Sequence, residues 1–309
     1  MRNEWMWAVV LAVSLAGCAS TQRQGGIPGV IAPGVEAELV REGYIFLEGP
    51  LGMADGGLLF VDRREADRIH RLQPDGKISV FREKANGANG LAYTRGGDLI
   101  VVEAAAKRIS RTGADGRIVE LTRGDGQNPL LAPNDLIVDA KGGVYFTDPG
   151  LRPLVKGRKV HVYFLAPGAT RAQVIDDQVA RPNGIILSPD GKTLLVADTI
   201  GHDVIGYDVQ PDGTVRNRRP LLRLRDIPAG EDSGADGMAV DRDGRIFVTS
   251  VKGVQVFDKS GQYLGTIPVP RRPTNVAFAG PGKRVLYITA REGLYRIQTL
   301  TQGPGWLGK

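Results

Sequence analysis

One short pattern recurs six times along this 309-residue chain and constrains its fold more than any other feature. Each copy holds a strand-like segment, a glycine-bearing turn and a second strand-like run, as in "NGLAYTRGGDLIVVE" at residues 89–103. Tight glycine turns between runs rich in β-branched and aromatic residues are typical of β-hairpins. Further strand-like runs follow each hairpin, and no long helical periodicity interrupts them. The pattern therefore predicts an all-β protein.

The copies start at intervals of roughly 40 to 50 residues, which is the length of a four-stranded propeller blade. We predict a six-bladed β-propeller with four-stranded antiparallel blades over residues 35–300, followed by a tail at residues 301–309. The last copy has room for only three strands. We expect Val35–Gly43 to supply its outer strand and close the ring, which leaves no long unpaired edge.

A polar residue stands at the start of each copy. The innermost strands of a propeller surround its central channel, so these six side chains are expected to converge on one face. Asn and Asp often cap turns, which would explain some of the set without any function. Glutamate is not a turn former, so we favour a functional ring. Its members are Glu48, Asn89, Asn134, Asn183, Asp236 and Asn275.

This ring offers only hard oxygen ligands, two carboxylates and several amide carbonyls. Such a set suits Ca²⁺, whereas Mg²⁺ demands stricter geometry and Zn²⁺ prefers His or Cys. We predict a divalent cation, with Ca²⁺ as first choice. A bound cation can polarise a carbonyl or phosphoryl oxygen. Asp236, or another nearby carboxylate, is the candidate proton acceptor.

The second strand of each hairpin should return to the same face. Its last residue and the following loop are therefore candidates for the second shell of the site or for substrate contact. The strand ends are Asp62, Glu103, Asp148, Asp198 and Ser250, and the loops after them carry Arg63, Arg64, Lys107, Arg152 and His202. For each residue taken singly we favour a solvated surface role, except that a role at the site is weighed equally for Asp148 and Asp198.

The first residues have a different character. Arg2 precedes a short apolar run that fits a signal peptide better than a membrane span. "LAGC" resembles the bacterial lipobox, so we expect residues 1–17 to be a lipoprotein signal peptide and Cys18 to be lipidated. The alternative is an ordinary secretory signal with a stray cysteine. Residues 18–34 are predicted to be a flexible tether. The expected location is the bacterial cell envelope, at the outer membrane and facing the periplasm, with the membrane as a partner.

Positive charge alone does not indicate a nucleic-acid partner. The chain carries a formal net charge of +6, and its densest basic cluster, Val215–Arg225, has no interleaved aromatic residues. We interpret that cluster as a solvated loop and predict no nucleic-acid binding.

Four motifs, in this order and at this spacing, resemble the senescence-marker protein/gluconolactonase/luciferin-regenerating enzyme family. They are "EGP" at Glu48–Pro50, "PNDLIVD" with "YFTDP", "PNGIILSPDGKTLLVADT" and "DGMAVD". The resemblance implies a six-bladed propeller with an axial divalent cation, usually calcium, and hydrolysis of lactones or, in one branch, of organophosphates. It implies that Glu48, Asn183 and Asp236 hold the metal, that Asn134 completes the site or touches substrate, and that Asp236 is the catalytic base or nucleophile.

One departure accompanies the resemblance. The family often has Trp shortly after "EGP", where this chain has Gly52 and Met53, so a differently shaped pocket wall is expected. Two hypotheses remain. The first is an exported, metal-dependent hydrolase, most simply a lactonase acting on a small lactone or ester, with organophosphate hydrolysis as a weaker variant. The second is a non-catalytic, lipid-anchored propeller that binds a partner or ligand.

Overall fold

The computed structural model describes residues 25–305 and residue 309 of the chain. The described residues form twenty-two β-strands and one short 3-10 helix, η1 (Pro281–Lys283). No helix in this part of the chain is long and apolar enough to cross a membrane. The predicted signal peptide, Cys18 and the first residues of the tether lie outside the described residues.

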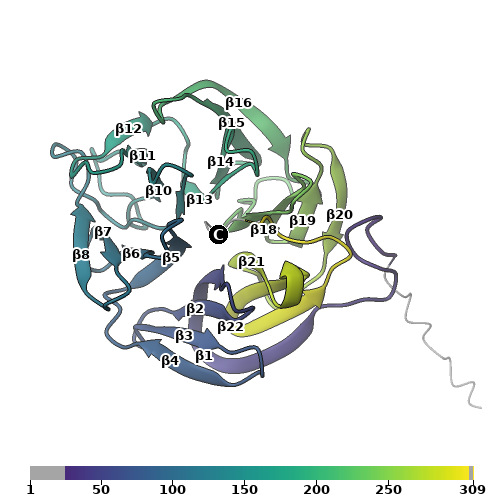
Figure 1. Ribbon diagram of the computed structural model, residues 1–309. Helices are drawn as coiled ribbons and strands as arrows, with labels where there is room; N and C mark the ends of the chain where they lie inside the picture. Colours follow the sequence, from purple (N-terminus) through teal and green to yellow (C-terminus); the bar gives the residue numbers. More distant parts are fainter. Residues whose placement is uncertain (1–24, 306–308) are drawn as a thin grey trace, which may run out of the picture.

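The strands form antiparallel sheets around a central axis, which confirms the predicted β-propeller (Figure 1). Four of the sheets have four strands each, as predicted, and their strands follow chain order across the sheet. These sheets contain β5 (Ala88–Tyr93), β6 (Leu99–Glu103), β7 (Arg108–Thr112) and β8 (Ile118–Thr122); β9 (Leu136–Val138), β10 (Val144–Asp148), β11 (His161–Leu165) and β12 (Gln173–Asp176); β13 (Pro182–Leu187), β14 (Thr193–Asp198), β15 (Asp203–Val209) and β16 (Val215–Arg223); and β17 (Met238–Val240), β18 (Ile246–Ser250), β19 (Gly253–Phe257) and β20 (Tyr263–Ile267).

The fifth sheet has six strands, so the described chain forms five hydrogen-bonded sheets where six blades were predicted. Two strands of unusual length join what would otherwise be separate blades, because β1 has 15 residues and β22 has 14. In order across the sheet, its strands are β21 (Asn275–Ala279), β22 (Val285–Gln298), β1 (Glu38–Gly52), β2 (Leu58–Asp62), β3 (Arg68–Leu72) and β4 (Ile78–Arg82).

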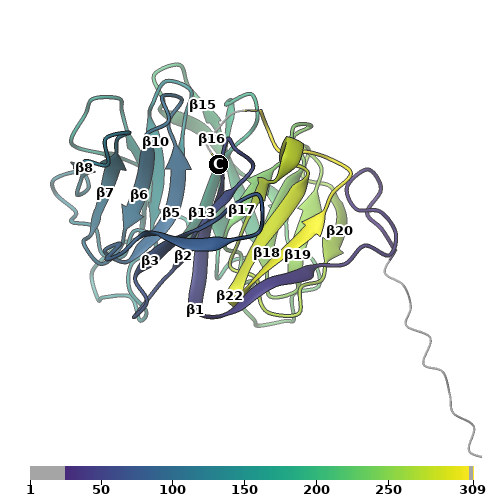
Figure 2. The ribbon, with the colours of Figure 1, turned by 60° about the horizontal axis from the view of Figure 1, so that its bottom comes forward.

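The two long strands also close the ring. The first part of β1 pairs with the end of β22, from Glu38 opposite Arg296 to Glu42 opposite Gly293. The last part of β1 turns to pair with β2, with Leu47 opposite Asp62. Figure 2 shows β1 and β22 running side by side. The prediction that Val35–Gly43 supplies the closing strand is confirmed for its strand residues.

Six inner strands contact one another in sequence around the axis: β1, β5, β9, β13, β17 and β21, with β21 returning to β1. The second strand of each hairpin is packed on both sides, so it is mainly apolar before its polar last residue. In β2 all five residues are buried, and so are all five in β6. The apolar side chains lie between neighbouring sheets, where Val61 and Leu91, for example, share one cluster. Burial of this apolar surface is the main force that holds the ring together.

Two segments differ from their predicted form. Residues 27–31 make a turn whose Ile27, Val30 and Ile31 side chains are buried against the last sheets, so the expected flexible tether does not hold for these residues. Apolar contact fixes them in place. The basic cluster read as a solvated loop contains strand β16, and three of its arginines form ion pairs with aspartates.

Candidate functional site

The inner strands approach one another closely where the ring residues stand. A Cβ added to Gly49 would lie 1.9 Å from the backbone oxygen of Asn89, and one added to Gly184 would lie 2.1 Å from that of Asp236. A Cβ on Gly237 would lie 1.9 Å from the Asn275 side chain. Only glycine allows this approach. Glycines that follow ring residues therefore bring those residues together at the axis.

Glu48 and Asp236 are the two carboxylates of the ring, and they influence each other. Glu48 is 3% exposed, and burial raises the pKa of its carboxyl to about 7, against the effect of the Arg63 charge. The pKa of Asp236 is raised by burial and then by the charges of Glu48 and Asp135, while Arg63 and Arg272 act in the opposite direction. Like charges held close together in a poorly solvated site favour protonation or a bound cation.

The Asn183 amide is oriented for a ligand. Its nitrogen donates to Thr199 Oγ1 at 3.0 Å, which turns the carbonyl oxygen the other way. That oxygen is buried and has no hydrogen-bond partner within residues 25–305 and 309. A buried acceptor without a donor is costly, and native proteins rarely leave one without a reason. A hard cation would satisfy it.

The remaining ring residues are arranged less uniformly. The Asn275 amide nitrogen lies 3.5 Å from Glu48 Oε2, a contact between residues 227 positions apart in the chain. Asn89 is buried, and its amide nitrogen has no partner among the described residues. Asn134 is partly exposed at the channel mouth, and its backbone oxygen accepts from Gly90 N at 2.9 Å.

Two further residues at the axis were not predicted. Asp135 is 1% exposed, and one of its carboxyl oxygens accepts a hydrogen bond from the Lys309 ammonium, which is equally buried. Figure 1 shows the C-terminal end of the chain at the centre of the propeller. Asp135 occupies the position that glycine holds after Glu48, Asn89, Asn183 and Asp236. This break in a glycine pattern is the sequence signal that would have found it.

Asp148 and Asp198, predicted near the site, bind backbone groups. The Asp148 carboxylate accepts from the N–H groups of Leu131 and Ala132 at 2.7 and 2.9 Å. Asp198 accepts from Arg181 N at 3.0 Å. Each carboxylate therefore fixes the segment that leads into the inner strand of its own sheet. In this way it helps to position the ring residue at that strand without facing the site.

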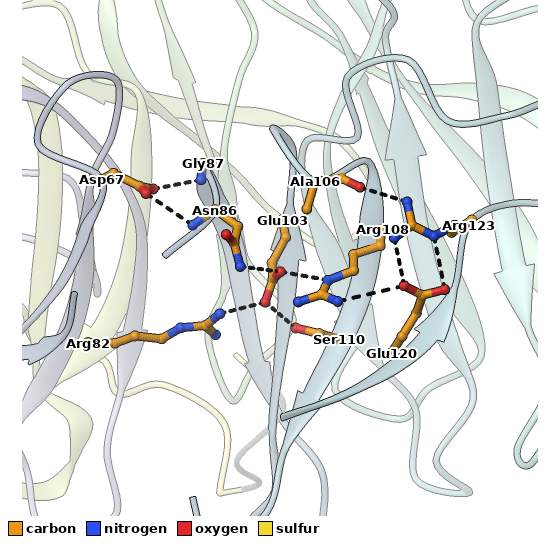
Figure 3. A network of polar contacts seen from close by, with 10 residues as sticks. All are labelled: Asp67, Arg82, Asn86, Gly87, Glu103, Ala106, Arg108, Ser110, Glu120 and Arg123. Carbon is orange, nitrogen blue, oxygen red and sulfur yellow. Dashed lines mark hydrogen bonds and ion pairs between the residues drawn. The ribbon is translucent and has the colours of Figure 1, made fainter. Parts of the chain in front are cut away.

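Not every buried carboxylate in the molecule belongs to this site. Glu103, at the end of β6, is fully buried and accepts hydrogen bonds from Arg82, Arg108, Ser110 and Asn86, at 2.7 to 2.9 Å (Figure 3). Burial raises its pKa, but these donors outweigh burial and hold the pKa below its ordinary value. The full set of donors identifies Glu103 as a structural residue.

A cavity of about 700 Å³ opens beside the ring. Phe46, Gly87 and Ala132 line it, and each stands two positions before a ring residue. Gly52 was expected to change the shape of the pocket wall, but it does not line this cavity. It packs against the neighbouring inner strand instead, where an added Cβ would lie 2.2 Å from the backbone oxygen of Phe278. Met53 lines a separate cavity with Tyr93. The departure from the family's Trp therefore does not shape the pocket at the ring.

The ring fits a hard cation by its chemistry. Within residues 25–305 and 309, no three His, Cys, Asp or Glu side chains form a cluster able to hold a metal by themselves. Amide oxygens must therefore complete any such set, and the free oxygen of Asn183 meets this requirement. The nearby Glu48 and Asp236 carboxyls have raised pKa values, which a cation would offset.

These features define a class: a β-propeller with acidic and amide side chains at one mouth of its channel and an open pocket beside them. The chain belongs to the SMP-30/gluconolactonase/LRE-like family, whose sequence profile matches residues 46–292. Gluconolactonase of Zymomonas mobilis is 26% identical over 294 residues, covering 86% of this chain and 82% of the relative. The 6-deoxy-6-sulfogluconolactonase of Pseudomonas putida is 30% identical over 275 residues, covering 86% and 90%. The solved gluconolactonase of Xanthomonas campestris aligns with a TM-score of 0.76 at 29% identity, covering 86% of this chain and 89% of that one.

Proposed function

We propose that this protein is a divalent-cation-dependent hydrolase that opens a small lactone. The observation that carries the proposal is the buried, partner-free oxygen of Asn183 beside two carboxyls with raised pKa values. Two relatives that cover most of the chain are named as lactonases, which supports the reaction class.

Glu48, Asn183 and Asp236 would hold the cation, with Asn134 beside them at the channel mouth. When bound, such a cation supplies polarisation of the ester carbonyl. Ca²⁺ is the first choice because all the donor atoms are oxygens and the mixed amide and carboxylate set imposes no strict geometry.

Asp236 is the proposed general base. It is the partly exposed carboxylate of the ring, so water and substrate can reach it, whereas Glu48 is buried. As a carboxylate, it can accept the proton that the attacking water loses. The apolar wall formed by Phe46, Leu131 and Leu151 would shield the lactone ring from bulk water.

We infer six blades, because six inner strands contact in sequence and the long β1 and β22 each change partner along their length.

The lipobox-like "LAGC" supports export and lipid anchoring at Cys18. Mass spectrometry of the protein isolated from membranes would test the anchor, and recovery of Cys18→Ser from the soluble fraction would support it.

The function is tested by metal analysis of the purified protein together with a panel of lactones assayed with and without chelator. We expect bound divalent metal, hydrolysis of at least one lactone, and loss of that activity with chelator that is restored by Ca²⁺. Metal-free protein that hydrolyses no lactone, with or without added Ca²⁺, would instead favour a propeller that only binds ligands.

A further inference from the structure

The cavity beside the ring has an uneven charge distribution. Three basic side chains line it, Arg63, Arg64 and Lys107, against one carboxylate, Asp67. Both Asp67 oxygens are engaged by backbone groups, accepting from Asn86 N at 3.2 Å and from Gly87 N at 2.6 Å. Asp67 therefore contributes little free acceptor capacity to the cavity.

None of the three cations forms an ion pair with a carboxylate in the described part of the chain. The contrast with Arg82 and Arg108 is direct, since both of these are paired with the Glu103 carboxylate. The lining of the cavity therefore carries several N–H donors that have no carboxylate partner among the described residues, and more positive than negative charge.

The turns that carry two of these cations are well defined. Arg64 and Lys107 both have left-handed backbone conformations, with φ of 64° and 51°, which non-glycine residues seldom adopt. The Arg64 guanidinium lies 4.6 Å from the centre of the Phe46 ring, in cation–π geometry. Both side chains thus start from fixed points on the cavity rim.

Arg63 links this rim to the reacting centre. Its charge acts on both Glu48 and Asp236, lowering the pKa of each carboxyl against the effect of burial. Arg63 thus lines the same cavity as Arg64 and Lys107 and also lies near enough to the two ring carboxyls for its charge to act on them. A ligand with one end at the ring would place its other end among Arg64 and Lys107.

We propose that the substrate is an anionic lactone, with its ester at the ring residues and a phosphate, sulfonate or carboxylate group held by Arg63, Arg64 and Lys107. This inference rests on the proposed lactone hydrolysis and adds the substrate class. Arginine and lysine bind such oxyanions through charge-assisted hydrogen bonds, which are stronger than neutral ones. A neutral sugar lactone would leave the three cations without a partner.

The test compares two substrates that differ only in charge, a six-membered aldonolactone and its 6-phosphate ester. We expect the wild type to have the higher kcat/KM for the phosphate ester. In Arg64→Gln/Lys107→Gln, the ratio of the two kcat/KM values should fall by about tenfold or more, because charge-assisted contacts are lost. Arg63 is left intact because its charge also acts on Glu48 and Asp236.

Lys259→Gln is the matched control, because Lys259 lines a different cavity, of about 510 Å³, between other blades. Its substrate ratio should equal that of the wild type. A wild-type enzyme that prefers the neutral lactone, or a double variant with an unchanged ratio, would overturn the inference while the lactonase function stands.

Failure of the function itself gives a different result, hydrolysis of neither lactone. Calorimetry with a neutral hexitol and its 6-phosphate, neither of which contains an ester to hydrolyse, then decides the inference without turnover. Tighter binding of the phosphate by the wild type, lost in the double variant, supports an anion site. Equal binding of both compounds contradicts it.

Discussion

Glu48 and Glu103 are both buried glutamates in β-strands, yet their surroundings are opposite. Glu103 accepts four side-chain hydrogen bonds, two of them from arginines, and its pKa is lowered. Among the described residues, Glu48 accepts only from the neighbouring Gly49 N–H at 3.3 Å and the Asn275 amide at 3.5 Å, and its pKa is raised to about 7.

The difference separates a carboxylate that stabilises the fold from one that the fold keeps for a ligand. Desolvation disfavours the charge of both, but only Glu103 has enough donors to offset it. Glu48 has fewer donors around it, and it acts on a second carboxyl nearby, that of Asp236. A site under-supplied with donors in this way requires a proton or a cation from outside the chain.

The largest expected effect concerns activity. Asp236→Asn should lower lactone hydrolysis by about 10²- to 10⁴-fold, because the amide cannot accept a proton as a general base. Steady-state kinetics would measure the loss, and circular dichroism would check that the propeller remains folded. Near-normal kcat in Asp236→Asn would remove this residue from the mechanism.

On the other side of the comparison, Glu103→Gln should lower the free energy of unfolding by about 3 kcal/mol, since it leaves two partly buried arginines without their carboxylate. Urea denaturation gives the value. The exposed pair Arg296–Glu38 provides a control, because Glu38→Gln should change stability by less than about 1 kcal/mol. A Glu103 effect as small as that of Glu38 would show that the network is not structural.

Glu48→Gln should raise the free energy of unfolding, whereas Glu103→Gln lowers it. The folded-state pKa of Glu48 lies above its ordinary value of 4.5, so its ionisation destabilises the fold progressively as pH rises from about 4.5 to about 7. In chelator at pH 8, Glu48→Gln should therefore be more stable than wild type, on the order of 2 kcal/mol. Thermal unfolding in chelator measures this. Destabilisation would mean that the Glu48 charge is already well balanced by the protein.

The smallest effect is in acid. The pKa of Glu103 is lowered on folding, so its contribution is present above the ordinary value of 4.5 and is lost as pH falls through the folded-state pKa. Between pH 5.5 and pH 3.5 the wild type should lose more stability than Glu103→Gln does. Parallel urea titrations at the two pH values would detect the difference, and equal losses would contradict the lowered pKa.

Local chemistry made most of the fold predictable. Hairpin turns and β-branched runs predicted all four of the sheets that have four strands. The shortage of one strand after Asn275 predicted closure by Val35–Gly43. The merging of sheets was not predictable, because the lengths of β1 and β22 depend on pairing between the two ends of the chain. Packing of Ile27 and Val30 depends on a distant apolar surface in the same way.

Part of the site was predictable for a similar reason. Oxygen-bearing residues in register at the inner strands predicted the ring, and the effect of the Glu48 charge on the pKa of Asp236 agrees with their expected convergence. Lys309 was missed, since a buried ion pair between residues 174 positions apart leaves no local pattern, whereas Asp135 could have been found from the break in the glycine pattern. Asp148 was expected beside the substrate because its strand ends on the ring face, but sequence does not reveal that backbone N–H groups take its oxygens.

Ring closure also sets an order of events during synthesis. Residues 38–42 are made first among the strands, yet their partners at 293–296 emerge from the ribosome last. The nascent chain must therefore carry an open edge until residues 293–296 have emerged. Glu48 cannot meet Asn275 before the later residue has been made, so a shorter nascent chain holds no finished ligand site, whatever blades it has already folded.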